Sequence, residues 1–398
     1  MTAGAPPASP DGTAPETLGA VLRPLLPLFV IDVLTAFTVG MVPPLLPLLA
    51  AEWQLSPLQA GLVNTLYAVG RLATSYPASA LRARRGTRAV VVLGLALLVL
   101  GLVGCGIAPG FPAFLVSRLV MGIGASAAFL AIFAELLETA PAAWRGRLTN
   151  GFEGMAILSL AVGGMLGAWI AGAVGWRIAF VGAGPVVLLC VFACRRLDPD
   201  AGRPQRAPSR PGEREGRSAH RRLLPVYVAS LSLSLTWSGL FATMAPLLGH
   251  TGYGLSSGAL GLALGAGYGA ELAGLLGVAL VIDRLRHEPV FLGGALAVAA
   301  GGLVLAIGTH PAVFVMGLVL VGGGFAVWMV PAIVLTDRVG TPIPPPYFAV
   351  YRIAMDAGMI VGPLALGAVA DLAGERAAVG SAGLALVAGG LALRLGRR

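Results

Sequence analysis

Long apolar blocks recur along this chain, and each is bounded by a short polar, proline or glycine segment. Each block is long enough to cross a bilayer core of about 30 Å, which takes about 20 apolar residues in a helix. The composition agrees, because 57% of the residues are hydrophobic and only 11% are charged. A soluble helical protein would show polar faces at the helical period, and these blocks lack them. The sequence therefore predicts an all-α membrane protein with many spans.

The apolar blocks predict twelve transmembrane helices, at 24–50, 57–81, 88–108, 112–138, 147–173, 177–194, 223–249, 256–281, 289–308, 311–336, 346–371 and 377–393. The longest polar break, 195–222, is rich in arginine and proline and has no apolar period, so it is predicted to be a linker. The expected organisation is a disordered cytoplasmic tail (1–22), a six-helix bundle (23–194), a cytoplasmic linker (195–222) and a second six-helix bundle (223–398).

Arginine sets the expected orientation. All 27 basic residues are arginine. Arg177 and Arg376 lie in loops on one side, and Arg71, Arg118 and Arg352 lie inside spans. The remaining arginines all fall in segments on the other side, which predicts that both termini are cytoplasmic.

The other chemical features exclude several classes of function. The net charge of +9 is carried by short loops between spans, where positive charge sets the orientation in the membrane, so we expect no nucleic-acid partner. The three cysteines lie in apolar blocks and the four histidines are scattered, so we expect no metal site, disulfide or cofactor. A membrane-embedded enzyme would need clustered carboxylates or a nucleophile with its base, and we find neither, so no catalytic residue is predicted.

The two halves of the chain resemble each other. Residues 55–73 align with 255–273, and this alignment places Arg71 on Glu271. Near the end of each half, 162–168 aligns with 361–367. Parallel repeats of six spans are typical of secondary transporters that bind substrate near the bilayer midplane, between the halves.

Several short motifs, in order along the chain, resemble those of the major facilitator superfamily. They are SALRARRGTR at 79–88, in which Ser79 and Ala83 replace the family's Gly and Asp, VIDRLRHEP at 281–289, SRLVMGIGASA at 117–127 and GWRIAF at 175–180. The segment AVYRIAMDAGMIVGPLALG at 349–367 is similar to the eleventh span of the family's drug and metabolite exporters.

The resemblance implies two pseudo-symmetric six-helix bundles and proton-coupled export by rocker-switch alternating access. The implied partners are a small-molecule substrate, protons and the lipid bilayer. We expect a monomer in a bacterial cytoplasmic (inner) membrane. In such a transporter the inner-face motifs latch neighbouring helices in the outward-open state, which assigns gating roles to Arg84, Asp283 and Arg284.

Charged residues within the spans are costly unless they face protein or water, so they are functional candidates. Asp32, Glu271 and Asp356 are predicted to couple protons. At about 1.5 Å per residue, Arg71 and Asp356 lie within about 4 Å of their span midpoints, whereas Asp32 and Arg118 are about 18 Å apart. We therefore expect Asp32 to pair with Arg71 rather than with Arg118, and Glu271 to approach Arg71 across the halves.

The expected substrate cavity contains Asn64, Tyr67, Arg71, Arg118, Trp237 and Trp328, because aromatic walls suit lipophilic substrates. Glu153 and Arg352 occupy equivalent places in the repeat and are expected to form a symmetric inner gate or brace. The competing interpretation is that these charges only hold helices together. The serines and threonines of 223–249 are expected to bond their own helix backbone.

The leading hypothesis is efflux of small lipophilic or amphipathic compounds. The alternatives are a facilitator or importer of a polar metabolite or organic anion bound by the cavity arginines, and a lipid transporter on the same fold.

Overall fold

The computed structural model describes residues 18–141, 144–197, 213–340 and 345–396, and all regular structure in these ranges is helical. The first half contains α1 (Leu18–Gly40), α2 (Val42–Trp53), α3 (Pro57–Ile107), α4 (Phe111–Thr139), α5 (Arg145–Val174), α6 (Trp176–Leu188) and α7 (Cys190–Cys194). The second half contains α8 (Glu213–Thr236), the π-helix η1 (Trp237–Met244), α9 (Ala245–Thr251), α10 (Ser257–Val281), the 3-10 helix η2 (Ile282–Arg284), α11 (His287–Ile307), α12 (Pro311–Phe325), α13 (Val330–Val339), α14 (Pro345–Ala373) and α15 (Glu375–Leu395). The helix α8 begins inside the range 195–222 that the sequence suggested as a linker.

Eleven helical stretches in the described ranges are long and apolar enough to cross a membrane. One of them, α3, is 51 residues long and is interrupted at Gly86, whose φ of 82° and ψ of 168° are not helical. A positive φ is favourable only for glycine, so the chain can turn there without strain. The two runs of α3 match the predicted spans 57–81 and 88–108, and with them counted separately the structure agrees with twelve spans.

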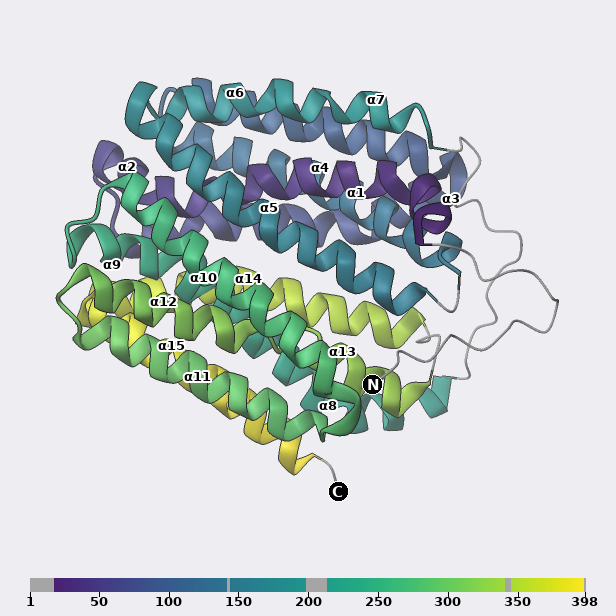
Figure 1. Cartoon of the computed structure of the whole chain (residues 1–398). Helices are drawn as coiled ribbons and strands as arrows, with labels where there is room; N and C mark the ends of the chain where they lie inside the picture. Colours follow the sequence, from purple (N-terminus) through teal and green to yellow (C-terminus); the bar gives the residue numbers. More distant parts are fainter. Residues whose placement is uncertain (1–17, 142–143, 198–212, 341–344, 397–398) are drawn as a thin grey trace.

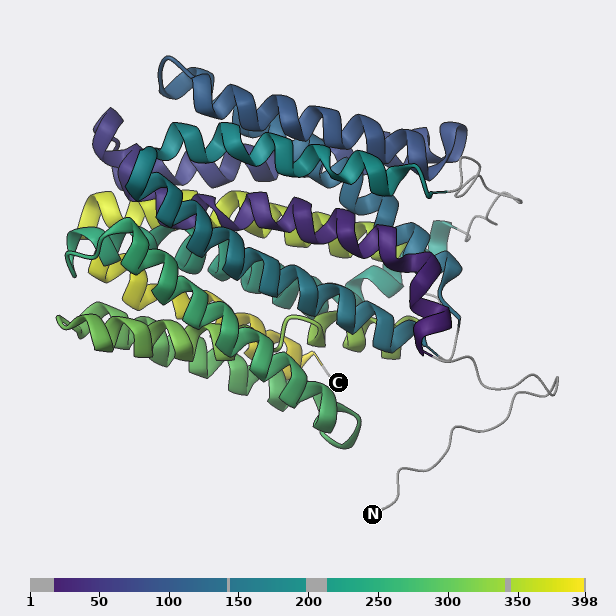
Figure 2. The ribbon, with the colours of Figure 1, turned by 45° about the horizontal axis from the view of Figure 1, so that its top comes forward.

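The helices of each half gather into their own bundle, and the two bundles lie side by side (Figures 1 and 2). Helices α3 and α14, and helices α5 and α10, pack against each other across the boundary. We call the end of the molecule that carries Gly86, α7 and the start of α8 the arginine-rich end (Figure 1). The other end, which carries α2 and α9, is called the opposite end.

The internal repeat is visible in local structure. Ser56 and Ser256 occupy equivalent positions, and each side chain accepts a hydrogen bond from the first turn of the helix that follows it, α3 or α10. Arg177 and Arg376 are also equivalent. Arg177 donates to the Ala108 carbonyl at 3.5 Å, and Arg376 donates to the carbonyls of Ala306 and Gly308 at 2.6 Å. In each half the arginine therefore caps the last carbonyls of the third span.

Glycine permits the closest helix packing in both bundles. A Cβ added at Gly122 of α4 would overlap the Tyr67 carbonyl of α3, and one at Gly322 of α12 would overlap the Gly267 carbonyl of α10. Gly122 and Gly322 are equivalent in the repeat, as are residues 67 and 267. Small residues at helix contacts let backbones approach in a membrane, where there is no hydrophobic drive for association.

Candidate functional site

A cavity of about 200 Å³ lies between the two bundles. Its walls come from α1, α3, α4 and α5 on one side and from η1, α10, α12, α14 and the α12–α13 turn on the other. The lining is mainly apolar, with Phe129, Trp237, Phe325, Trp328 and three methionines. The rings of Trp237 and Trp328 meet edge to face, with centroids 6.1 Å apart. Of the residues predicted for the cavity, Tyr67, Arg71, Trp237 and Trp328 line it.

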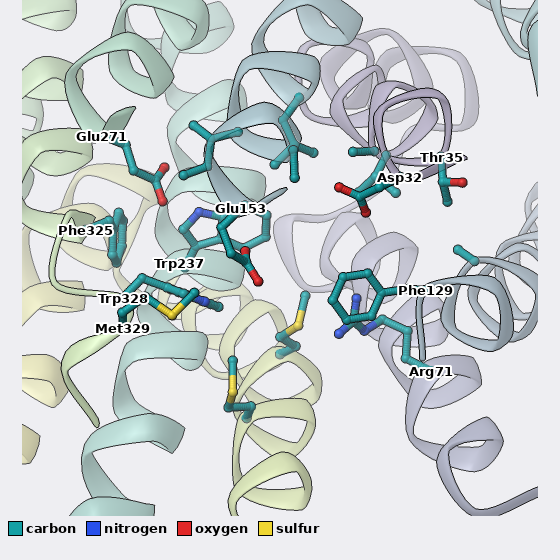
Figure 3. Close-up of a pocket in the computed structure, with 18 of the residues that line it drawn as sticks. Asp32, Thr35, Arg71, Phe129, Glu153, Trp237, Glu271, Phe325, Trp328 and Met329 are labelled. Atoms are coloured by element: carbon teal, nitrogen blue, oxygen red, sulfur yellow. The ribbon is translucent and has the colours of Figure 1, made fainter. Parts of the chain in front are cut away.

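Five charged side chains also line this cavity: Asp32, Arg71, Glu153, Glu271 and Arg352. Figure 3 shows Asp32 and Arg71 on the side of the first bundle and Glu271 on the side of the second, with Glu153 between them in the view. The sequence thus identified the helices that carry charge into the cavity, but their pairing differs from the expectation.

Arg71 pairs with Asp356 rather than with Asp32. Its Nε and one terminal nitrogen donate to the Asp356 Oδ1 at 3.4 and 3.3 Å, and the Asp356 side chain is fully buried. This ion pair joins α3 of the first bundle to α14 of the second. The expectation that Asp32 is the partner of Arg71 is corrected here, because α14 presents Asp356 to Arg71 at the same depth.

Arg352 lies one helical turn before Asp356, and its guanidinium is 3.9 Å from the second oxygen of that carboxylate. Glu153 is attracted to both Arg352 and Arg71. The predicted relationship between Glu153 and Arg352 thus exists as an electrostatic one, but Arg71 and Asp356 belong to the same charge network.

Two cavity carboxylates keep an oxygen without a hydrogen-bond partner among the described residues. They are Asp32 on α1 and Glu271 on α10, each only 4% exposed. Trp237 interacts with the Glu271 side chain. Glu153 repels both carboxylates. The expected approach of Glu271 to Arg71 is not among the contacts of either side chain, since Arg71 is bound to Asp356.

Arg118 and Asn64 were expected in the cavity, but they lie outside its lining. The buried Arg118 donates to the Val63 carbonyl at 3.1 Å and to the Asn64 Oδ1 at 3.3 Å. Its guanidinium also lies 4.8 Å from the centre of the Tyr67 ring. Asn64 in turn donates to the Ala242 carbonyl at 3.0 Å and to the Thr243 hydroxyl at 2.9 Å. These residues form a bridge from α4 through α3 to the π-helix η1 of the other bundle.

Further contacts hold the bundles together toward the opposite end. Asp371 of α14 accepts hydrogen bonds from the Ser56 hydroxyl and the Leu58 amide, at the start of α3. A Cβ added at Gly61 would lie 2.6 Å from the Pro363 carbonyl oxygen. Among described residues, the hydrogen bonds that join the bundles run from this end to the Arg71–Asp356 pair. On the other side of that pair, toward the arginine-rich end, the side chain of Tyr76 on α3 is 84% exposed. The structure is therefore closed at the opposite end.

The predicted latch at the arginine-rich end belongs to the outward-open state, whereas this structure is closed at the opposite end. Arg84 and Arg284 are exposed, and the side chain of Asp283 lies outside the described part of the chain. Arg82 is instead the arginine that joins helices there. It donates to Glu135 at 3.1 Å and to Glu138 at 2.7 and 2.8 Å, linking α3 to the end of α4. The family motif includes Arg84 but not Arg82. The sequence feature that could have indicated Arg82 is the pair of acids, Glu135 and Glu138, at the end of the fourth predicted span.

Serine and threonine residues of α8 and η1 bond mainly to their own backbone. Ser230, Ser232, Thr236 and Thr243 each donate to a carbonyl three to five residues earlier. Ser238 is different, because it donates to the Met359 carbonyl of α14 at 3.2 Å. These hydroxyls are therefore used by backbone carbonyls, and none of these residues lines the cavity.

The family model of the Major Facilitator Superfamily matches residues 28–342, which is well over half of the chain. The chain belongs to this superfamily. A crystal structure of the nucleoside transporter NupG shares the fold, with a TM-score of 0.75 at 11% identity, covering 94% of this chain and 100% of that one. At that identity the likeness shows the fold alone.

Curated relatives within the superfamily carry the name Multidrug resistance protein MdtL. The protein from Klebsiella pneumoniae (strain 342) is 25% identical over 286 residues, which cover 71% of this chain and 72% of the relative. The protein from Escherichia coli (strain K12) is 25% identical over 288 residues with the same coverage. This major facilitator superfamily member is thus a multi-pass transporter of a bacterial inner membrane, acting on small molecules, and not an enzyme.

Proposed function

We propose that this protein exports small lipophilic or amphipathic compounds in exchange for protons, as a monomer working by rocker-switch alternating access. The observation that carries the proposal is the cavity between the bundles, with aromatic and methionine walls and the unpartnered carboxylate oxygens of Asp32 and Glu271. Apolar walls suit lipophilic ligands, and a buried carboxylate without a partner is suited to take up a proton. The names of the curated relatives support drug efflux.

The arginine distribution supports an orientation with both termini in the cytoplasm, so the opposite end faces outward. In that orientation the contacts of Asp371 and Asn64 close the cavity to the outside. Alternating access then requires these contacts to break while the arginine-rich ends of the bundles come together.

Asp32 is our candidate for the exchanging proton. The groups that face it in the same cavity are Glu153 from α5, Arg71 from α3, Arg352 from α14 and Glu271 from α10. Asp32 has no arginine partner, unlike Asp356, so protonation at Asp32 need not break an ion pair.

The alternative of an organic-anion transporter is less well supported. Arg71 is bound to Asp356, and Arg118 is held outside the cavity lining. Of the three arginines, only Arg352 keeps unpartnered guanidinium nitrogens toward the cavity, 3.9 Å from the Asp356 carboxylate. An anion entering the cavity would also meet Asp32, Glu153 and Glu271.

The test is substrate uptake into proteoliposomes with an acidic lumen, using a panel of neutral, cationic and anionic aromatic compounds. We expect uptake of lipophilic compounds that collapses when the pH gradient is dissipated. Asp32→Asn is expected to abolish the dependence on the gradient, whereas Glu138→Gln at the surface should retain it. Uptake that is independent of the gradient in the unmodified protein would contradict proton exchange.

A further inference from the structure

The cavity carries more carboxylates than guanidinium groups. Asp32, Glu153 and Glu271 line it together with Arg71 and Arg352. Asp356, behind the lining, neutralises Arg71 directly and also attracts Arg352. Arg352, whose Nε and one terminal nitrogen have no hydrogen-bond partner among the described residues, is then the one lining guanidinium left to balance three lining acids. Three carboxylates against one guanidinium favour a positive ligand in the cavity.

Glu271 is the lining acid on the side of the second bundle, and Trp237 interacts with its side chain. Its Oε2 has no hydrogen-bond partner among the described residues, and neither does the hydroxyl of Tyr268, one turn earlier on α10. Glu153 adds repulsion. A buried charge without a partner is costly, so a cation placed here would gain both the attraction and the missing contact.

Several aromatic rings line the same side of the cavity as this carboxylate. Figure 3 shows Phe325, Trp237 and Trp328 on the same side of the cavity as Glu271, with Met329 beside Trp328. The faces of aromatic rings attract cations, tryptophan does so most strongly, and the attraction increases when the site is dry. Trp237 and Trp328 meet edge to face, so their rings form a corner rather than a flat wall.

We infer that Glu271, Trp237 and Trp328 form a binding site for the positively charged nitrogen of an organic cation, whose apolar part lies against the aromatic and methionine walls. This inference rests on the proposed function and specifies its substrate. Asp32, on the other side of the cavity in Figure 3, lies apart from this corner. The two acids have separate roles, because Glu271 binds the substrate and Asp32 exchanges the proton.

The experiment measures equilibrium binding of three probes of nearly one shape to the purified full-length protein. They are benzyltrimethylammonium, its neutral carbon analogue neopentylbenzene, and the anion phenylmethanesulfonate. We expect the cation to bind best. Glu271→Gln keeps the size and removes the charge, so it should weaken cation binding about tenfold, or about 1.4 kcal/mol, without changing neopentylbenzene binding. Retained binding of the neutral probe shows that the variant is folded.

Two further variants localise the effect. Trp328→Leu should weaken cation binding more than neopentylbenzene binding, because only the cation uses the ring face. Glu138→Gln removes a carboxylate at the end of α4, away from the cavity, and should leave all three affinities unchanged. The inference is overturned if the unmodified protein shows no saturable cation binding, if the anion binds better than the cation, or if Glu271→Gln weakens cation and neutral probe equally.

Failure of this inference and failure of the proposed function give different results. Gradient-driven uptake of neutral compounds, with cation binding unaffected by Glu271→Gln, would contradict the cation site and support proton-coupled export. Cation binding that depends on Glu271, without any gradient-driven uptake, leaves the site standing and removes the proton exchange.

Discussion

Asp371 of the second bundle caps the first turn of α3 in the first bundle, where its Oδ1 accepts the Leu58 amide hydrogen at 3.2 Å. Its other oxygen accepts the Ser56 hydroxyl at 2.9 Å. The first amides of a helix have no partner within the helix, and the helix dipole favours a negative charge there. A carboxylate from one bundle therefore satisfies backbone groups of the other.

We expect Asp371→Ala to shift the protein toward opening at that end. Loss of a helix cap is worth about 1 kcal/mol, or about a fivefold change in a two-state population. The measurement is the labelling rate of Ala60→Cys, at a buried position of α3, by a membrane-impermeant maleimide. Asp371→Asn keeps the acceptor oxygen and should label at an intermediate rate. Equal rates in all three proteins would show that this cap does not hold the end closed.

The Arg71–Asp356 pair predicts strong coupling between two substitutions. Arg71→Met leaves Asp356 fully buried with only Arg352 nearby, so we expect a loss of about 3 kcal/mol in the free energy of unfolding. Adding Asp356→Leu should restore at least half of that loss, since both charges are then gone. Unfolding in detergent, followed for both single variants and the double variant, measures the coupling. Additive losses would exclude a direct pair.

The contact between Gly122 and Tyr67 predicts a sharp size limit. A methyl group at Gly122 would overlap the Tyr67 carbonyl, so Gly122→Ala should lower stability by about 1–3 kcal/mol or prevent assembly. Gly182 of α6 is a matched control, because a Cβ there meets nothing within 4 Å. Gly182→Ala should be neutral or slightly stabilising, as alanine favours a helix more than glycine does. Similar behaviour of the two variants in thermal unfolding would count against the close α3–α4 contact.

Arg82 and Arg84, two residues apart on α3, are expected to differ in importance. Arg82 bonds to Glu135 and Glu138, whereas Arg84 is exposed. We expect Arg82→Ala to destabilise the protein by about 1–3 kcal/mol, since Glu135 would lose a partner in a mostly buried site, and Arg84→Ala by no more than about 0.5 kcal/mol. Thermal unfolding of the two variants compares them directly. The reverse order of stability losses would contradict the bonds of Arg82 to Glu135 and Glu138.

The sequence was sufficient to predict the spans, the repeat and the helices that bring charge into the membrane. Apolar block length determines the spans, and the alignment of 55–73 with 255–273 revealed the equivalent bundles. The helical rise per residue also placed Arg71 and Asp356 at a similar depth in the membrane and Arg118 far from Asp32. The contacts of Arg71 and Arg118 agree with these depths.

Partners could not be predicted, because depth along a helix does not say which helices are neighbours or which face each presents. Asp32 and Asp356 were both at accessible depth for Arg71, and only the packing of α3 on α14 decides between them. The same limit applies to Asn64, which binds Thr243 of η1 rather than lining the cavity, and to Arg118, which binds Asn64. For Asp371, the sequence showed only an acid at the end of a span.

The π-helix η1 has a mechanical consequence. It begins at Trp237, which lines the cavity, and includes Ala242 and Thr243, which receive the bridge from Asn64. A π turn holds about one residue more than an α turn. If that turn tightened to α winding, everything beyond it would rotate by about 100°, the angle of one residue in an α-helix. The extra residue of the π turn is placed where a small rewinding near Trp237 would become a large rotation at the closed end.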